Sequence, residues 1–245
     1  MKYVGSKSRI KKSILPILQT MIDENNITTY IEPFVGGANI IDKILCENKI
    51  GGDNQEVLIA LLKHVQNGGK LPTEVSKELY DDVRKNKNTN KYEKWLIGAV
   101  GFLASYNGKY FGGYAGIITT KVGTVRNYYD ESKRNLEKQI DDIKNIDFIN
   151  CDYTFFSDVK NCLIYCDIPY KNTTGYDTSK NFNHESFWEW ARKMSNNNIV
   201  IVSELESPDD FECIWERMVE RTQDNKSRKQ SIEKLFIYKG DDDNE

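Results

Sequence analysis

The sequence predicts an α/β domain whose parallel sheet is interrupted by a mostly helical insertion. Strand and helix patterns alternate through residues 1–69, polar helical patterns fill residues 70–145, and apolar strand patterns return in residues 146–240. Alternating strands and helices are typical of parallel strands joined by crossover helices. We therefore expect one sheet domain, formed by residues 1–65 and 145–245, with an insertion at residues 66–144.

The first elements follow from periodicity. Residues 8–23 have apolar side chains at helical spacing, and Ser6 or Ser8 is a suitable cap for this helix. Residues 28–37 predict a short strand that ends in a glycine turn, and residues 38–48 predict the helix after it. These elements predict the start of a parallel sheet.

The later elements continue the same alternation. A second strand ends at Asp53, and the following helix stops at Gly68 and Gly69. The insertion contains one glycine- and tyrosine-rich loop, "SYNGKYFGGYAGIITT". Further strands are predicted at residues 146–152, 162–170, 198–204 and 230–240, with a helix at residues 182–197.

Composition limits the classes of protein. Hydrophobic residues make up 39% of the chain, which is enough for a packed core, and no apolar run approaches the roughly 20 residues that span a bilayer. We expect no signal peptide and a cytoplasmic location. The five cysteines form no C-x-x-C pair and there are only two histidines, so we expect no metal site.

The charge is unevenly distributed. Residues 63–144 contain 12 Lys and 3 Arg against 10 Asp and Glu, a net charge of +5, whereas the whole chain carries −3. A basic segment in an acidic chain indicates contact with a polyanion. A solvated helical surface is an equally good interpretation of the charge alone.

The glycine turn in "EPFVGGAN" lies between the first strand and the next helix. Glycine allows a ligand to approach backbone N–H groups closely. Asp53 follows Gly36 by 17 residues and ends the second strand, where an acidic side chain accepts hydrogen bonds from ribose hydroxyls. Glycines used only for packing would give the same pattern.

The stretch "CDIPY" ends an apolar strand pattern with Asp167. Pro169 keeps Ile168 extended, so the Ile168 carbonyl is free to point into a cleft, and Tyr170 offers a flat face. Two oxygens and an aromatic face suit an exocyclic amine on a flat heterocycle. The alternative is a capping aspartate followed by a turn proline. Ser203 and Glu204 end another strand at the same predicted edge.

Three elements in this order, "YVGSKSRIKKSILPIL", "YIEPFVGGANI" and "LIYCDIPYKNTTGYD", resemble the Dam-like (D12 class, alpha group) N6-adenine DNA methyltransferases of phages and bacteria. "SELESPDDFECIWE" and "EKLFIYKG" are similar to later elements of that family. The resemblance covers essentially the whole chain. It implies a Rossmann-like S-adenosylmethionine-dependent methyltransferase sheet, with residues 66–144 as the target-recognition domain.

The resemblance also implies roles for particular residues. Asp167, Ile168, Pro169 and Tyr170 match the catalytic Asp-Pro-Pro-Tyr motif. S-adenosylmethionine is expected to contact Tyr3, Lys7, Glu32, Pro33, Phe34, Gly36, Gly37, Asp53, Asp152 and Asp167. Ile168 replaces the first proline of the motif, which removes the pre-proline restriction on Asp167 and makes the loop less preorganised. Ala38 replaces the usual third glycine.

The insertion is expected to bind double-stranded DNA. The predicted contacts are Tyr106, Asn107, Lys109, Tyr110, Arg126, Lys133 and Arg134. Lys and Arg contact phosphates, Asn addresses base edges, and aromatic rings stack or wedge. The alternative is that the tyrosines pack the loop onto its own helices. No metal and no obligate protein partner are expected.

The predicted reaction is methylation of adenine N6. Hydrogen bonds from N6 to the Asp167 carboxylate and the Ile168 carbonyl would localise the nitrogen lone pair, and the base must first be flipped out of the duplex. The alternatives are a degenerate methyltransferase that binds cofactor or DNA without efficient catalysis, and the same fold acting on RNA or on a protein amide. A dinucleotide-dependent oxidoreductase fits less well, because "FVGGAN" departs from G-x-G-x-x-G.

Overall fold

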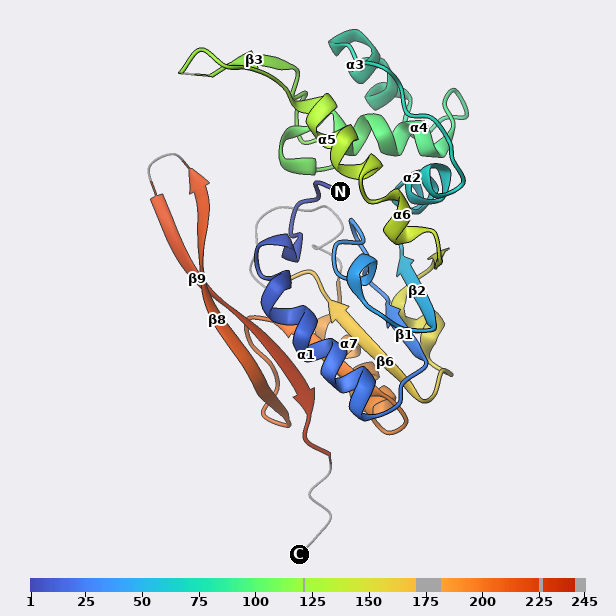
Figure 1. The fold of residues 1–245 in the computed structure, drawn as a ribbon, viewed down its shortest axis with the longest axis vertical. Coiled ribbons are helices and arrows are strands. Elements are labelled where there is room, and N and C mark those ends of the chain that lie inside the picture. The colour runs from blue at the N-terminus through green and yellow to red at the C-terminus, as the bar shows by residue number, and fades with distance from the viewer. Residues whose placement is uncertain (121, 171–181, 225–226, 241–245) are drawn as a thin grey trace, which may run out of the picture.

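The computed structural model describes residues 1–120, 122–170, 182–224 and 227–240. At its centre is a seven-stranded sheet with the strand order β5-β2-β1-β6-β7-β9-β8 (Figure 1). Its strands are β1 (Thr29–Glu32), β2 (Asn48–Asp53), β5 (Ile146–Asn150), β6 (Cys162–Asp167), β7 (Ile199–Glu204), β8 (Phe211–Asp224) and β9 (Ser227–Tyr238). The predicted α/β sheet, built from both ends of the chain, is confirmed.

The pairing of the strands places the predicted site residues at one edge. The strands β5, β2, β1, β6 and β7 are parallel, and β9 runs antiparallel to both β7 and β8. The parallel strands therefore share one carboxyl edge, at which Glu32, Asp53, Asp167 and Glu204 are the last strand residues. The strand order reverses between β1 and β6, and open α/β sheets bind ligands at such a point.

Helices cover both faces of the sheet. Figure 1 shows α1 (Lys11–Glu24) on one face and α7 (His184–Ser195) on the other. Alternate residues of β6 therefore enter different cores, because successive strand side chains point to opposite faces. Tyr165 packs in the core of the α1 face, whereas Cys166 packs in the core of the α7 face.

The helical segment forms one end of the molecule (Figure 1). Its elements are α3 (Lys77–Asn86), α4 (Lys94–Gly98), the π-helical turn η3 (Ala99–Leu103), the 3-10 turn η4 (Tyr106–Gly108), α5 (Tyr128–Glu137) and α6 (Ile140–Ile143), together with a hairpin of β3 (Ile117–Thr119) and β4 (Val125–Asn127). Gly98 of α4 packs directly on α2 (Glu56–Gln66), and a Cβ added at Gly98 would lie 2.2 Å from the Val57 carbonyl oxygen. The predicted domain limits at residues 66–144 remain a prediction.

The helix predicted at residues 38–48 is wrong. This segment contains only the 3-10 turn η2 (Ile41–Lys43). Ala38 has a φ of +54°, outside the right-handed helical region, and its carbonyl oxygen accepts a hydrogen bond from Gln139 Nε2 at 2.7 Å. In an α-helix that carbonyl would accept the amide four residues later, so the tertiary contact replaces the helical one.

Two further features differ from what the sequence predicts. β8 was not predicted, and it pairs with β9 as a long antiparallel hairpin. Ser6 caps the 3-10 turn η1 (Lys7–Arg9) by accepting from the Ser8 amide, whereas the N-cap of α1 is Ile10, without a side-chain cap. The chain thus makes a separate turn at Lys7 before α1 begins.

The described ranges lack two kinds of feature. No helix there is long and apolar enough to cross a membrane. No group of three or more His, Cys, Asp or Glu side chains there is arranged to hold a metal ion.

Candidate active site

A buried ion-pair cluster lies at the carboxyl end of β6. Lys7 Nζ lies 2.8 Å from Asp167 Oδ1 and 3.2 Å from Glu233 Oε2, and it also donates a hydrogen bond to the Tyr170 hydroxyl. The Tyr170 hydroxyl donates to Glu233 Oε2 at 2.5 Å and lies 3.2 Å from Ser203 Oγ. We call these five residues, Lys7, Asp167, Tyr170, Ser203 and Glu233, the Lys7 cluster.

Strand register explains how distant parts of the chain meet here. Asp167 is the partner of Ser203 across β6 and β7, and Ser203 is the partner of Leu235 across β7 and β9. Glu233 lies two residues before Leu235 and therefore faces the same side of the sheet. That side is covered by α1, and η1 brings Lys7 onto it.

Burial within the Lys7 cluster is unequal. The side chains of Lys7 and Glu233 are 6% and 8% exposed, whereas that of Asp167 is 24% exposed. Burial alone would lower the pKa of Lys7, but the charges of Asp167 and Glu233 raise it above its usual value. Burial, together with the same two carboxylates, raises the pKa of Tyr170. Asp167 is therefore the charged member that a ligand can reach most easily.

Ile168 and Pro169, the two residues after Asp167, are held on the α7 face of the sheet. The Ile168 side chain is buried in the core that α7 covers, and the Pro169 carbonyl accepts a hydrogen bond from His184 Nε2 at 2.9 Å. The sequence predicts a less preorganised loop at Ile168, and in the structure the buried Ile168 side chain anchors this position. Residues 171–177 of the quoted motif lie outside the described residues.

The glycine turn and Asp53 also meet. Asp53 accepts hydrogen bonds from the Gly36 amide at 3.1 Å and the Gln55 amide at 2.9 Å. Burial raises the pKa of Asp53 to about 6, although both amides act in the opposite direction. The Tyr3 side chain packs over the turn, and a Cβ added at Gly36 or Gly37 would lie 2.9 Å from it.

The other predicted cofactor residues differ in their surroundings. Glu32 is buried and accepts a hydrogen bond from the Tyr30 hydroxyl at 2.8 Å, and burial raises its pKa well above the usual value. Pro33 is buried as well. Asp152 is exposed and caps its own 3-10 turn by accepting from the Thr154 amide. It follows Asn150, the strand partner of Asp53, by two residues.

An aromatic stack joins the glycine turn to the Asp152 turn. The Phe34 and Tyr153 rings are stacked with centroids 5.7 Å apart and an interplanar angle of 26°. Both side chains are half-buried, on the α7 side of the sheet. Sequence reasoning missed Tyr153, because an aromatic residue beside a predicted acidic contact is not a signal by itself.

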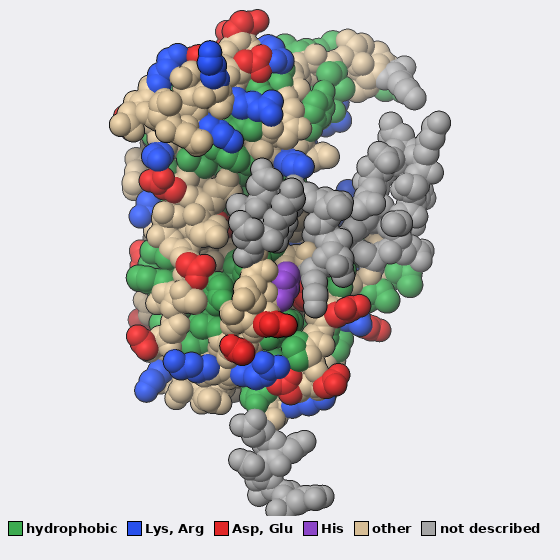
Figure 2. Space-filling view, turned by 180° about the vertical axis from the view of Figure 1, so that it is seen from behind, with side chains coloured by type: hydrophobic (Ala, Val, Ile, Leu, Met, Phe, Trp, Pro, Cys, Tyr) green, Lys and Arg blue, Asp and Glu red, His purple; other side chains and the backbone are tan. Residues whose placement is uncertain are grey.

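The predicted DNA contacts fall into two groups. Tyr106, Asn107, Lys109 and Arg134 are exposed, and the Tyr106 ring lies edge-on to Tyr128, with centroids 5.8 Å apart. The other group is engaged within the segment: Tyr110 packs on Phe102, Arg126 pairs with Glu131 at 2.6 Å, and Lys133 donates to the Pro72 carbonyl at 3.2 Å. On the face seen in Figure 2, Lys and Arg side chains gather over this end of the molecule and again over the opposite end.

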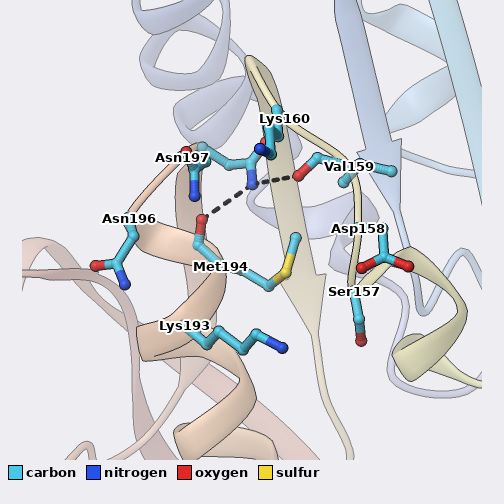
Figure 3. Close-up of a pocket in the computed structure, with 9 residues that line it drawn as sticks. Ser157, Asp158, Val159, Lys160, Lys193, Met194, Asn196 and Asn197 are labelled. Carbon is cyan, nitrogen blue, oxygen red and sulfur yellow. Dashed lines mark hydrogen bonds between the residues drawn. The ribbon is translucent and has the colours of Figure 1, made fainter.

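A separate hollow of about 520 Å³ lies elsewhere (Figure 3). Lys160 and Val159 line it just before β6, and Asn197 and Asn198 line it just before β7. It is therefore at the amino edge of the sheet, opposite Asp167. The Asn198 side chain donates to the carbonyls of Val159 and Met194 there, which are structural bonds (Figure 3).

Comparison with known families decides the class of protein. The family model described as D12 class N6 adenine-specific DNA methyltransferase matches residues 3–204. The chain belongs to this family. The resemblance predicted from the three sequence motifs is thereby confirmed, and the parallel sheet with its one inserted antiparallel strand is the Rossmann-like fold expected for a methyltransferase.

Individual relatives of this D12-class chain are distant. It is 27% identical to "Type II methyltransferase M.MjaIII" of Methanocaldococcus jannaschii, over 73% of this chain and 72% of the relative. It is 24% identical to "Modification methylase StsI" of Streptococcus sanguinis, over 78% of this chain but only 31% of that protein. A candidate methylase from Haemophilus influenzae, HI0767, aligns over 94% of this chain and 88% of its own, with 9% identity and a TM-score of 0.35.

Glu233 is the member of the Lys7 cluster that sequence reasoning missed. It lies on the same side of β9 as the buried residue Leu235. A carboxylate at a strand position that alternation predicts to be buried is a usable signal, because burying a charge is unfavourable unless it is paired. In this D12-class chain that signal points to the carboxyl edge of the parallel strands.

Proposed function

We propose that this chain transfers the methyl group of S-adenosylmethionine to N6 of an adenine flipped out of duplex DNA. The observation that supports this most strongly is the arrangement at Asp167. Its carboxylate ends β6 at the ligand-binding edge and is oriented by Lys7 at 2.8 Å, yet it keeps 24% of its side-chain surface exposed. The family match gives the substrate class.

The residues near the glycine turn fit S-adenosylmethionine. A carboxylate has about four lone-pair sites, and the two amide hydrogen bonds to Asp53 leave acceptor capacity for ribose hydroxyls. Phe34 and Tyr153 provide half-buried aromatic surface for a purine, beside Asp152. When bound, the cofactor supplies an electrophilic methyl group on a positively charged sulfur.

Asp167 and Ile168 act on the adenine. Its N6 lone pair is delocalised into the ring, so the amine is a poor nucleophile. The Asp167 carboxylate accepts one N6–H and the Ile168 carbonyl accepts the other, which localises the lone pair and stabilises the positive charge that develops on N6. Once the methyl group is on N6 and S-adenosylhomocysteine is the leaving product, the surplus N6 proton passes through the Asp167 carboxylate, which is 24% exposed, to solvent. The Tyr170 ring stacks on the flipped base and helps to offset the cost of unstacking it. Binding of the DNA offsets the entropy that is lost when the N6 amine is held in line with the methyl group.

We assign target recognition to the helical segment, with the limits predicted at residues 66–144. Its exposed Lys109 and Arg134 suit phosphates, and exposed Tyr106 and Asn107 suit bases. The relatives bear the names of a type II methyltransferase and a modification methylase. These names support a modification role for this chain in a restriction–modification pair.

The test is methyl transfer from tritiated S-adenosylmethionine to unmethylated duplex DNA, followed by digestion to nucleosides. We expect label in N6-methyladenine and little label in an RNA duplex of the same sequence. Label that enters RNA preferentially would favour the alternative substrate. Cofactor binding by calorimetry without label in either nucleic acid would favour the degenerate methyltransferase.

We expect cofactor binding to weaken as the pH falls below about 6. Burial raises the pKa of Asp53 to about 6, so the carboxyl is protonated below this pH and loses the charge that attracts ribose hydroxyls. The Kd for the cofactor should rise by up to about tenfold per pH unit below that value. Calorimetric titration from pH 5 to pH 8 measures this. Asp53→Asn should bind more weakly at pH 8 and lose this pH dependence; an unchanged slope in the variant would contradict the assignment.

A further inference from the structure

β9, which lies between β7 and β8 in the sheet, carries an acidic residue into the candidate active site. Glu233 lies in β9, beyond residues 3–204, where the family model ends. Its carboxylate reaches both Lys7, at 3.2 Å, and the Tyr170 hydroxyl, at 2.5 Å. It therefore touches both residues that flank Asp167.

The burial of Glu233 calls for a reason beyond pairing. Its side chain is 8% exposed, and a buried carboxylate is costly even when it is paired. One carboxylate is enough to neutralise the Lys7 ammonium, and Asp167 already lies 2.8 Å from it. A second carboxylate beside the same ammonium adds negative charge to the site.

That charge bears on the reaction. When ionised, Glu233 adds a second carboxylate charge to the one that Asp167 places beside the Lys7 ammonium. If Lys7 and Asp167 were alone, the pair would be neutral and would attract a developing positive charge only weakly. In a site shielded from water, an added negative charge stabilises a developing positive charge more strongly than it would in bulk solvent.

We propose that Glu233 is a positioning residue for methyl transfer, which holds Lys7 and the Tyr170 hydroxyl beside Asp167 and adds a negative charge to the Lys7 cluster. This inference rests on the proposed function. Glu233 does not touch the adenine; it acts through Asp167, whose acceptor strength it preserves, and through Tyr170, whose ring it orients by the hydroxyl.

Steady-state and single-turnover kinetics of Glu233→Gln test the proposal. We expect kcat to fall by about one to two orders of magnitude, since a positioned electrostatic contact is lost. The KM values for cofactor and DNA should change less than kcat. Glu233→Asp keeps the charge but shortens the reach, and its kcat should lie between the two. The matched control is Glu216→Gln, an exposed carboxylate on β8 of the same hairpin, which should retain wild-type kinetics.

A second measurement separates this inference from the proposed function. The measurement is a double-mutant cycle of the free energy of unfolding in urea, which needs no enzymatic activity. It compares the wild type, Lys7→Met, Glu233→Gln and the double variant. We expect the double variant to lose less stability than the two single variants together. Wild-type kcat in Glu233→Gln would overturn the inference. If the wild type methylates no nucleic acid, the proposed function fails, and the role of Glu233 in methyl transfer fails with it. The cycle then still tests the contact: coupling would show that Glu233 holds Lys7 in place, and independent effects of the two substitutions would overturn that part of the inference.

Discussion

Replacing Asp167 by alanine is expected to lower kcat for adenine methylation by about a thousandfold, the largest functional effect of any single change in this chain. The substitution removes the acceptor for one N6–H and the charge that faces the developing cation. Lys7 stays paired with Glu233 at 3.2 Å, so the buried ammonium keeps a partner and the fold should survive. Single-turnover methylation with saturating cofactor and DNA measures the effect.

Two comparisons make the result specific to Asp167. Asp167→Asn keeps an acceptor oxygen without the charge, so its rate should lie between alanine and wild type. Asp158→Ala removes an exposed carboxylate before β6, at the opposite edge of the sheet, and should leave the rate unchanged. Cofactor affinity within about threefold of wild type would show that the loss concerns the chemical step. An alanine variant that retains a tenth of the wild-type rate would exclude Asp167 from the reaction.

The largest effect on stability is expected from Gly98→Ala. The added Cβ would lie 2.2 Å from the Val57 carbonyl oxygen, a backbone atom that cannot turn aside as a side chain could. Either α4 or α2 must move, and overpacking of this kind costs about 3 kcal/mol. For a chain of this size the melting temperature should fall by about 10 °C. Calorimetry or circular dichroism measures it.

Gly68→Ala is the control for backbone strain without a clash. Gly68 has a φ of +79° and nothing lies within 4 Å of the Cβ position, so alanine there costs about 1 kcal/mol. The two variants should therefore differ in melting temperature by several degrees. Equal melting temperatures would mean that the contact between α2 and α4 yields without cost.

Periodicity predicted much of the sheet because its parallel strands are short and apolar. β1, β2, β6 and β7 each end at a polar residue, and a helix is the next element after β2 and after β6. The same pattern placed Asp53 and Asp167 at one edge, which the structure confirms. Their roles in binding and catalysis stay predictions.

The failures share a cause, which is contact between residues far apart in the chain. The helix predicted after β1 does not form, because the Gln139 side chain donates a hydrogen bond to the Ala38 carbonyl oxygen. β8 was missed because its side-chain pattern is irregular, with a bulge between Cys213 and Trp215 in its pairing with β9. Glu233 was missed because its meaning depends on Lys7, more than 200 residues earlier. Local propensity carries no information about such pairs.

The order of the strands in the chain differs from their order in the sheet at β9, and this affects how the site is completed during synthesis. β9 is made after β8 but lies between β7 and β8 in the sheet, so it must enter beside β7 once the preceding strands exist. A nascent chain that has emerged only through β7 already holds Lys7, Asp167 and Tyr170, yet the carboxylate of Glu233 is still missing. On our proposal, a chain that has emerged only through β7 therefore lacks the group that positions Lys7 and the Tyr170 hydroxyl, and the site is complete only once the β8–β9 hairpin has joined the sheet.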